Sequence, residues 1–193
     1  MKTVSRSLKK AGLCLCLALA LPAQARAGED NQRQTKFAQS YGLEARRDLR
    51  GAIRALEDLE EDDYLVELRL GWLNYRNEAY KTSADHYSRA ARLALDAVEP
   101  LLGMMLPLQA AGLIDAALQA GKSALKLDPC NYTALSRMAG IHYSRKDYSQ
   151  AASLYKKLAL LYPTDTEMLR PGAKYGTGHG WRSAKTRWQP LPG

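Results

Sequence analysis

The sequence predicts an all-α protein built from stacked antiparallel helix pairs, and the first reason is an internal period. Pro129 and Pro163 each end an apolar stretch with helical spacing. Leu95 occupies the equivalent place one step earlier, and the step has the same length in both cases. A fixed period of about 34 residues indicates a repeated supersecondary unit. We therefore expect three consecutive copies, over residues 64–97, 98–131 and 132–165.

The second reason is that five more columns of residues recur in the same register. They are Tyr80, Ile114 and Tyr148; Ser83, Ala117 and Ala151; Tyr87, Gly121 and Tyr155; Ala90, Ala124 and Leu158; and Leu93, Leu127 and Leu161. Within one copy, the small residue and the aromatic residue four places later share one stripe of a helix. Small residues on that stripe let the second helix of a pair approach the first closely.

The third reason is that the first helices carry apolar stripes of their own. These are Leu101, Met104, Met105 and Leu108 in the second copy, and Leu135, Met138 and Ala139 in the third. Each pair buries its apolar face only when a neighbouring pair stacks on it. Pro107 lies inside one of these helices and frees the carbonyl of Gly103 from its helical partner, so we expect a kink there.

Together these residues resemble the tetratricopeptide repeat (TPR) family over about residues 64–165. The matching residues are Leu70-Gly71, Tyr80, Ser83, Tyr87 and Ala90 in the first copy; Gly112, Ala117, Ala124 and Pro129 in the second; and Tyr148, Ala151, Tyr155 and Pro163 in the third. The resemblance implies a TPR-like α-solenoid of about seven or eight helices with a right-handed superhelix. Four departures from the family pattern are Glu67 for Trp, Asn74 for Tyr, Glu78 for Gly and Gly121 for a large aromatic residue.

Residues 28–63 are expected to form a degenerate helical hairpin or an N-terminal cap. Ala52, Leu56 and Leu59 repeat the second-helix stripe. The step from Ala52 to Ser83 is three places shorter than the period, so this segment lies outside the regular array.

Residues 166–193 are expected to form a basic tail rather than a fourth repeat. Glycine and proline recur there at a density that prevents a helix. We therefore predict disorder, with a truncation or an altered reading frame as the alternative.

Residues 1–27 have the layout of a secretory signal peptide. Four basic residues precede an apolar run from Ala11 to Leu21, and small residues follow. The run is too short to span a bilayer comfortably, since a spanning helix needs roughly 20 apolar residues. We expect cleavage after Ala27 and a periplasmic or secreted protein, with an uncleaved membrane anchor as the less favoured alternative.

The charge and cysteine content change when the signal peptide is removed. Five basic residues and two cysteines lie within 1–27, so the formal charge falls from +8 to +3 and only Cys130 remains. The tail from Arg170 onward holds five more basic residues, which leaves the body at −2. The body therefore lacks the basic cluster of a nucleic-acid surface, and we expect no nucleic-acid partner. No internal disulfide can form.

No motif in the sequence predicts catalysis, a metal or a cofactor. Residues 116–123 match a loose phosphate-loop form, but we place them in the middle of a helix whose amides are already bonded. His86 and His142 are isolated, with no second metal ligand at suitable spacing. Cys130 has no evident histidine partner, and we expect a partly buried thiol. A small exported enzyme is thus the least favoured alternative.

The resemblance implies that the first helices line the inner curve of the array and form a groove for a partner. The positions expected to point into it are Trp72, Tyr75 and Arg76 in the first copy, Leu106, Gln109 and Ala110 in the second, and Gly140, Tyr143 and Ser144 in the third. The alternative is that Trp72 and Tyr75 pack against the N-terminal hairpin. Some families of this fold grip a C-terminal carboxylate with Lys and Asn, but Leu68 and Trp72 occupy those positions here.

We therefore expect an exported protein-interaction scaffold that binds a peptide or helix of a partner in this groove. No membrane insertion is expected after cleavage. A self-associating structural array, and hence a homo-oligomer, stays open as an alternative.

Overall fold

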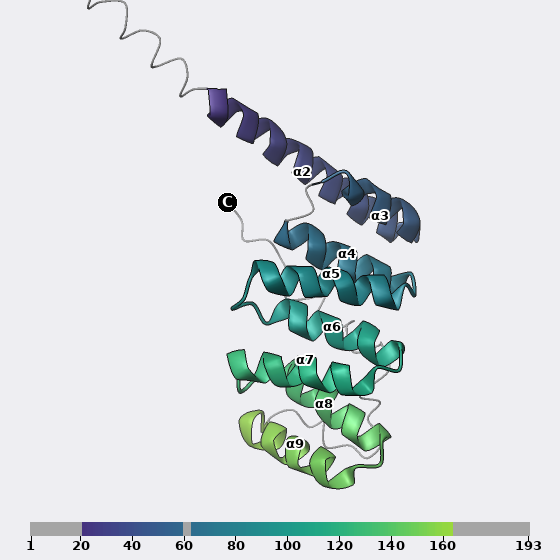
Figure 1. Cartoon of the computed structure of the whole chain (residues 1–193), viewed down its shortest axis with the longest axis vertical. Coiled ribbons are helices and arrows are strands. Elements are labelled where there is room, and N and C mark those ends of the chain that lie inside the picture. The colour runs from purple at the N-terminus through teal and green to yellow at the C-terminus, as the bar shows by residue number, and fades with distance from the viewer. Residues whose placement is uncertain (1–20, 60–62, 164–193) are drawn as a thin grey trace, which may run out of the picture. The chain divides into compact units, whose positions relative to one another are not determined.

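The computed structural model of the chain describes residues 21–59 and 63–163, with residues 21–29 described as backbone only. The predicted tail lies outside these residues, as does most of the predicted signal peptide. The chain divides into two compact units, one up to residue 61 and one from residue 62. All elements within the described ranges are α-helices, which confirms the predicted fold class (Figure 1).

The described part of the first unit contains two helices, α2 (Leu21–Ala45) and α3 (Leu49–Glu57), which pack against each other. Asp48 caps α3, because its carboxylate accepts a hydrogen bond from a backbone amide of the first turn at 2.8 Å. One side of α3 is buried, including Ala52 and Leu56 of the expected stripe.

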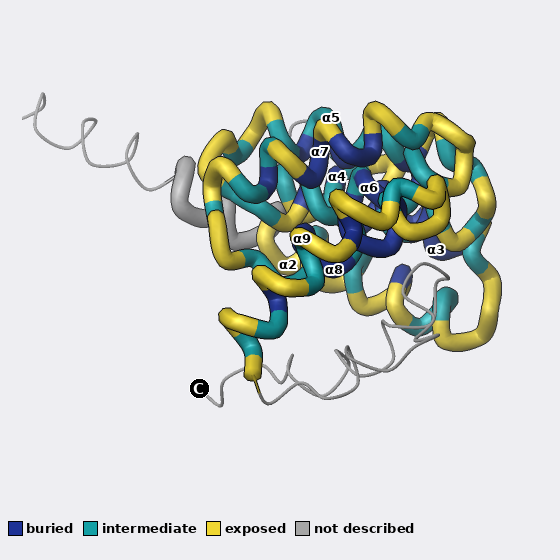
Figure 2. Tube along the Cα trace, turned by 90° about the horizontal axis from the view of Figure 1, so that it is seen from below, coloured by how far each residue is buried: buried dark blue, intermediate teal, exposed yellow. Residues whose placement is uncertain are grey.

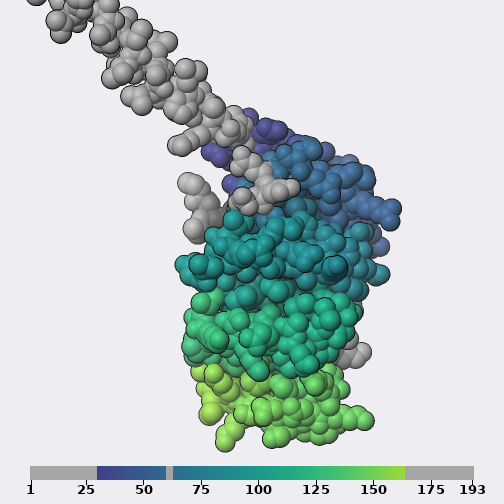
Figure 3. Space-filling model, viewed as in Figure 1, coloured from purple at the N-terminus to yellow at the C-terminus, as the bar shows by residue number. Residues whose placement is uncertain are grey.

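The described part of the second unit contains three helix pairs in a TPR-type arrangement. The pairs are α4 (Tyr64–Arg76) with α5 (Tyr80–Leu93), α6 (Glu99–Ala110) with α7 (Ile114–Leu127), and α8 (Tyr132–Ser144) with α9 (Tyr148–Leu161). Each pair falls inside one of the three copies expected from the period. Figure 3 shows the residues of this unit in successive bands of colour, as expected if each pair covers the next.

The turn inside each pair repeats one backbone geometry. Glu78, Gly112 and Lys146, which stand at equivalent places in the three copies, all adopt a left-handed conformation with φ of 63°, 76° and 64°. In each turn the backbone amide of the next residue donates a hydrogen bond to a carbonyl of the preceding helix. In the second copy, for example, the Leu113 amide donates to the Leu108 carbonyl at 2.8 Å. This closure is a common helix C-cap. Glu78 therefore replaces the family's glycine without changing the turn, at a conformational cost of roughly 1–2 kcal/mol.

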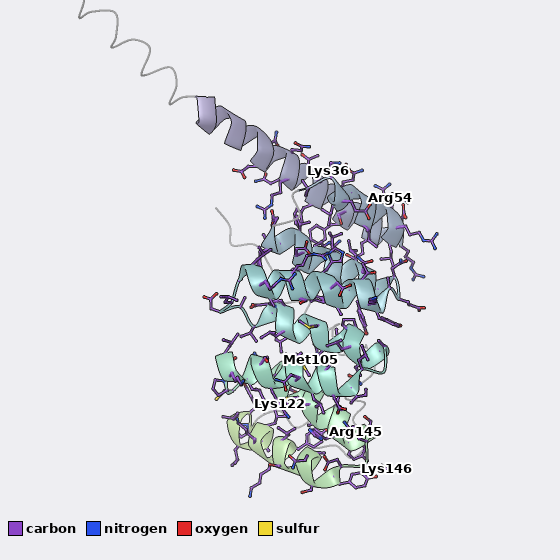
Figure 4. The ribbon with its side chains drawn as sticks, viewed as in Figure 1. Lys36, Arg54, Met105, Lys122, Arg145 and Lys146 are labelled. Atoms are coloured by element: carbon purple, nitrogen blue, oxygen red, sulfur yellow. The ribbon has the colours of Figure 1, made fainter. Side chains whose placement is uncertain are left out.

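The core of the second unit runs between the helix pairs, where the small-residue stripe is buried (Figure 2). Ala117 and Ala124 on α7 are fully buried, and Met105 on α6 belongs to the same core cluster as Ala117 (Figure 4). A Cβ added at Gly121 would lie only 2.8 Å from Met138 Sδ and 3.0 Å from Met105 Cε. Two methionine side chains thus fill the space that an aromatic residue at position 121 would occupy.

The first two pairs are joined by Tyr87 on α5, which is 5% exposed. Its ring lies against two glycines. A Cβ at Gly71 on α4 would be 3.0 Å from three ring atoms, and one at Gly103 on α6 would be 2.6 Å from Tyr87 Cζ. These glycines make room for the aromatic residue that the period predicts at this position.

The remaining family departures, Glu67 and Asn74, are both buried and both bonded. Glu67 is 2% exposed, with His86 Nδ1 2.8 Å from its Oε2 and Arg89 Nε donating to its Oε1 at 2.9 Å. Asn74 donates to the Leu70 carbonyl at 2.9 Å. A charged network between α4 and α5 therefore replaces the apolar contact expected of a tryptophan.

Pro107 lies inside α6 and is buried. The helix continues past it to Ala110, and the kink expected at this position stays a prediction. Across the described residues, no helix combines the length and apolar character needed to cross a bilayer.

Candidate partner-binding face

The first helices of the three pairs, α4, α6 and α8, define the candidate binding surface, which we call the first-helix face. Helices α4 and α6 are in direct contact. Helix α8 reaches α6 through Arg137, whose Nη1 donates a hydrogen bond to the backbone carbonyl of Leu102. The face is therefore tied together across the three copies.

An aromatic cluster occupies the C-terminal end of α4 and the start of α5. The rings of Trp72 and Tyr75 lie 6.0 Å apart, and those of Tyr75 and Tyr80 lie 6.1 Å apart, each pair tilted. The Arg76 guanidinium lies 5.5 Å from the centre of the Trp72 ring. Residues three and four apart on a helix are neighbours, which is why Trp72, Tyr75 and Arg76 meet. The structure thus brings these three predicted residues together.

A second cluster lies next to the first and centres on Arg137. Burial lowers the pKa of Arg137 to about 10, while the nearby Tyr87 and Tyr75 phenols act in the opposite direction. Burial likewise raises the pKa of both tyrosines. Arg137 therefore remains a cation at neutral pH, although its side chain is partly buried.

The other predicted residues are placed differently. Tyr143 is 58% exposed and packs edge-on against Tyr148, with ring centres 5.5 Å apart. Leu106 and Gln109 are half-buried on α6. Gly140 is buried and so offers little surface to a partner. Ala110 and Ser144 are exposed at the ends of α6 and α8.

The sequence interpretation missed Arg137 as a member of the face. It also missed that Tyr80 and the buried Tyr87, both on α5, lie against residues of α4. The register of Arg137 gave no signal of this role, because the same column holds Gly103 one full period earlier. The positions expected to point into the groove began at Gly140 in the third copy, so Arg137 fell outside them. Its long side chain nonetheless reaches the neighbouring first helix.

The charges on the first helices are unequal. Beyond the fourth residue of each helix, α4, α6 and α8 carry three arginines, Arg69, Arg76 and Arg137, and no acidic residue. Glu67, within the first four residues of α4, is bound to His86 and Arg89 on α5. Glu99 is the first residue of α6, so the three first helices together carry three arginines and two acidic residues.

The other chemical candidates do not form a site. Residues 116–123 all lie within α7, as the sequence interpretation expected. Cys130 is exposed, so the expectation of a partly buried thiol is wrong, because the loop after Pro129 leaves it at the surface. His142 lies 2.9 Å from Asp147, the N-cap of α9. No group of three potential metal ligands occurs among the residues that the structure describes.

Comparison with known proteins agrees with this architecture. Residues 108–170 match the family model described as tetratricopeptide repeat. A curated relative, the protein CTR9 homolog of Arabidopsis thaliana, is 30% identical over 97 residues. That stretch is 50% of this chain but only 9% of the relative.

Solved structures extend the similarity to most of the chain. A crystal structure of MamA superposes with a TM-score of 0.64 at 15% identity, covering 85% of this chain and 99% of that one. The structure of YrrB, described as a TPR protein with an unusual peptide-binding site, gives a TM-score of 0.61 at 17% identity, covering 80% and 85%. The regular period, the three helix pairs and the family model matched over residues 108–170 identify a helical solenoid of the tetratricopeptide repeat type, a fold that generally serves as a protein-interaction module.

Proposed function

We propose that the protein is an exported scaffold that binds a peptide or helix of a partner protein on its first-helix face. The observation that carries the proposal is the cluster of Trp72, Tyr75 and Tyr80 with Arg76 beside it. Aromatic residues and arginine dominate the binding energy of protein interfaces. The likeness to YrrB, which has a peptide-binding site, supports a peptide as the ligand.

Burial explains why this cluster suits a partner. Trp72 and Tyr75 are half-buried, so each ring is held by its neighbours while part of it stays accessible. A held aromatic side chain loses little conformational entropy on binding, and the area it offers is large. Tyr143 adds an exposed ring on α8, which extends the contact surface toward the third copy.

Site-specific crosslinking in the native compartment tests this proposal. A photo-reactive amino acid replaces Trp72 or Tyr143 in one set of variants, and Lys122 or Lys156, exposed on the second helices α7 and α9, in the control set. We expect one partner protein to be captured from the first set only. Capture from the control positions alone would place the interface on the second helices and refute the proposed face.

Export rests on the sequence of residues 1–27 and needs its own test. Fractionation of the source cells and N-terminal sequencing should find the protein outside the cytoplasm, beginning at residue 28. A cytoplasmic chain that begins at residue 1 would refute export and leave the binding proposal intact.

Self-association is the second candidate, because α9 exposes apolar residues. Leu160 is 75% exposed and Leu161 is 38% exposed on this last described helix. Light scattering at high protein concentration separates the two candidates. A monomer would count against a self-associating array.

A further inference from the structure

We propose that the outer side of the last two helix pairs contacts an anionic lipid surface, through exposed lysines and leucines of the second helices α7 and α9. The residues of this surface, which we call the lysine-leucine patch, are Lys122, Lys126, Leu127, Lys156, Leu160 and Leu161. The inference goes beyond the proposed function, because it concerns a separate surface and does not depend on which partner the first-helix face binds.

The first step is that Leu160 points away from the core. It stands nine residues after buried Ala151, which is about two and a half helical turns, so the two side chains lie on opposite sides of α9. Leu160 is 75% exposed. The equivalent residues of the earlier copies, Arg92 and Lys126, are exposed as well, although another helix pair follows each of them. A further pair stacked after α9 would therefore leave Leu160 in contact with solvent.

The second step is that the C-terminal ends of α7 and α9 lie close together. The Nζ atom of Lys157 on α9 donates a hydrogen bond to the Pro129 carbonyl, just beyond α7, at 2.9 Å. The Tyr162 hydroxyl donates to the Cys130 carbonyl at 2.7 Å. Residues one period apart occupy equivalent places in stacked pairs, so the patch residues of α7 and α9 form rows on one surface.

The third step is the sign of the charge. Residues 116–127 and the whole of α9 together hold four lysines and no aspartate or glutamate. Lys122, Lys126 and Lys156 are exposed, and they take part in no ion pair within the described structure. The patch is therefore locally positive.

The acidic residues that flank these two helices are bonded to other groups. Asp115, in the first turn of α7, accepts a hydrogen bond from Arg145 at 2.6 Å. Asp128, directly after α7, accepts from the Asn131 side chain at 3.0 Å. Asp147 caps the start of α9 through its side chain. Among the described residues, none of these three carboxylates is bonded to a lysine of the patch.

The fourth step selects a lipid surface over another polyanion. Lysines attract anionic headgroups, and apolar side chains beside them enter the boundary between headgroups and acyl chains. Leu127 and Leu161 are 43% and 38% exposed, so with Leu160 they place three leucines beside three lysines. A nucleic acid would contact the lysines but leave these leucines next to its phosphates.

The sequence that follows α9 has the same character. Residues 164–193 hold five basic residues against two acidic ones, and they include two tryptophans. Tryptophan is enriched where proteins meet the membrane–water interface.

Vesicle flotation tests the inference with the mature chain, from residue 28 onward, which lacks the apolar run of the signal peptide. The vesicles contain phosphatidylcholine alone, or phosphatidylcholine with about one third of the anionic lipid phosphatidylglycerol. We expect binding to the anionic vesicles to be tighter by about tenfold or more, and to weaken as salt rises. Equal binding to both kinds of vesicle, or binding to neither, would overturn the inference.

Two variants locate the binding on the patch, and each has a matched control. Leu160→Ser should weaken binding to the anionic vesicles about tenfold, and Lys156→Gln about fivefold. Leu65→Ser on α4 and Lys81→Gln on α5 change the same residue types at exposed positions outside the patch, and both should bind like the original protein. Far-UV circular dichroism and thermal unfolding confirm that each variant folds. Losses of the same size in the controls would show that the patch is not the contact.

Other occupants of the patch would give different results, and each would overturn the inference. A loss in Lys156→Gln without one in Leu160→Ser would show that charge alone is recognised, as would tighter binding of a single-stranded oligonucleotide than of the anionic vesicles. A dimer that Leu160→Ser converts to a monomer in light scattering would show that a second copy covers the patch.

The crosslinking experiment keeps these failures apart from failure of the proposed function. Capture of a partner at Trp72 without vesicle binding would leave the scaffold proposal intact and remove only the lipid contact. Vesicle binding without capture would do the reverse.

Discussion

A single methyl group added at Gly103 should destabilise the second unit, although the same change normally stabilises a helix. The Cβ of Gly103→Ala would lie 2.6 Å from Tyr87 Cζ and 2.7 Å from Cδ1. Carbon atoms normally approach to about 3.5–4.0 Å, so the ring must retreat by roughly 1 Å. Tyr87 has little room to do so, because its other neighbour, Gly71, also lies against the ring.

The expected magnitude follows from two opposing effects. Overpacking of a buried site costs about 1–3 kcal/mol. Alanine gains up to about 1 kcal/mol over glycine inside a helix. We therefore expect a net loss of about 1–2 kcal/mol in the free energy of unfolding. For a unit of this size, each kcal/mol lowers Tm by about 4–8 °C.

Urea denaturation followed by far-UV circular dichroism measures the loss, and two controls isolate its cause. Gly42→Ala on α2, where the nearest atom is 3.9 Å away, should be neutral or stabilising. In a Tyr87→Leu background, Gly103→Ala should lose most of its effect. An equal loss with and without the tyrosine would refute the steric explanation, as would a Gly103→Ala protein of unchanged stability.

Three other changes test separate parts of the structure. Asp63→Ala removes the carboxylate that accepts hydrogen bonds from two backbone amides at the start of α4, at 2.8 and 3.3 Å. The free energy of unfolding, measured by urea denaturation, should fall by about 1 kcal/mol. A protein of unchanged stability would show that the cap is not needed. Glu67→Gln removes the buried negative charge that is bonded to α5, and it should lower the free energy of unfolding by about 1–3 kcal/mol. Adding Arg89→Met should restore part of this loss in the double variant. Additive losses would contradict a shared network. Stability should fall as pH rises above about 10, because the unfolded phenol of Tyr87 deprotonates there while burial keeps the folded pKa higher. Burial also raises the pKa values of the Tyr64 and Tyr75 phenols, which adds to this decline, whereas Arg137 opposes it above about pH 10 because its folded pKa is lowered. Tyr87→Phe should therefore flatten the decline, and a steeper decline would show the assignment to be wrong.

The sequence predicted the helix pairs well because their determinants are local and periodic. Ala117, Ala124 and Ala151 stand at fixed intervals, and all three are buried as a close helix contact requires. The residues that depart from the family pattern were harder to interpret. Glu67 is tolerated in the core only because His86 and Arg89 of the next helix bind its carboxylate. No spacing rule in the sequence predicts that contact.

Only part of the candidate face could be predicted from the sequence, because one of its residues joins the face through a long side chain that extends to another helix pair. Trp72, Tyr75 and Arg76 meet because they are neighbours on one helix, which the sequence shows directly. Arg137 belongs to the face because its long side chain crosses to the backbone of another copy. That meeting depends on how the helices pack, and Gly103 in the same column gives no sign of it.

The Tyr87 and Arg137 contacts have a consequence for how the second unit loses its structure. An array linked only by adjacent helices can fray from one end, copy by copy. Here a ring from the first copy lies against the second, and a guanidinium from the third is anchored on the second. Opening any one copy breaks a contact belonging to another, so the slowest-exchanging amides of α4, α6 and α8 should exchange with solvent at a common rate.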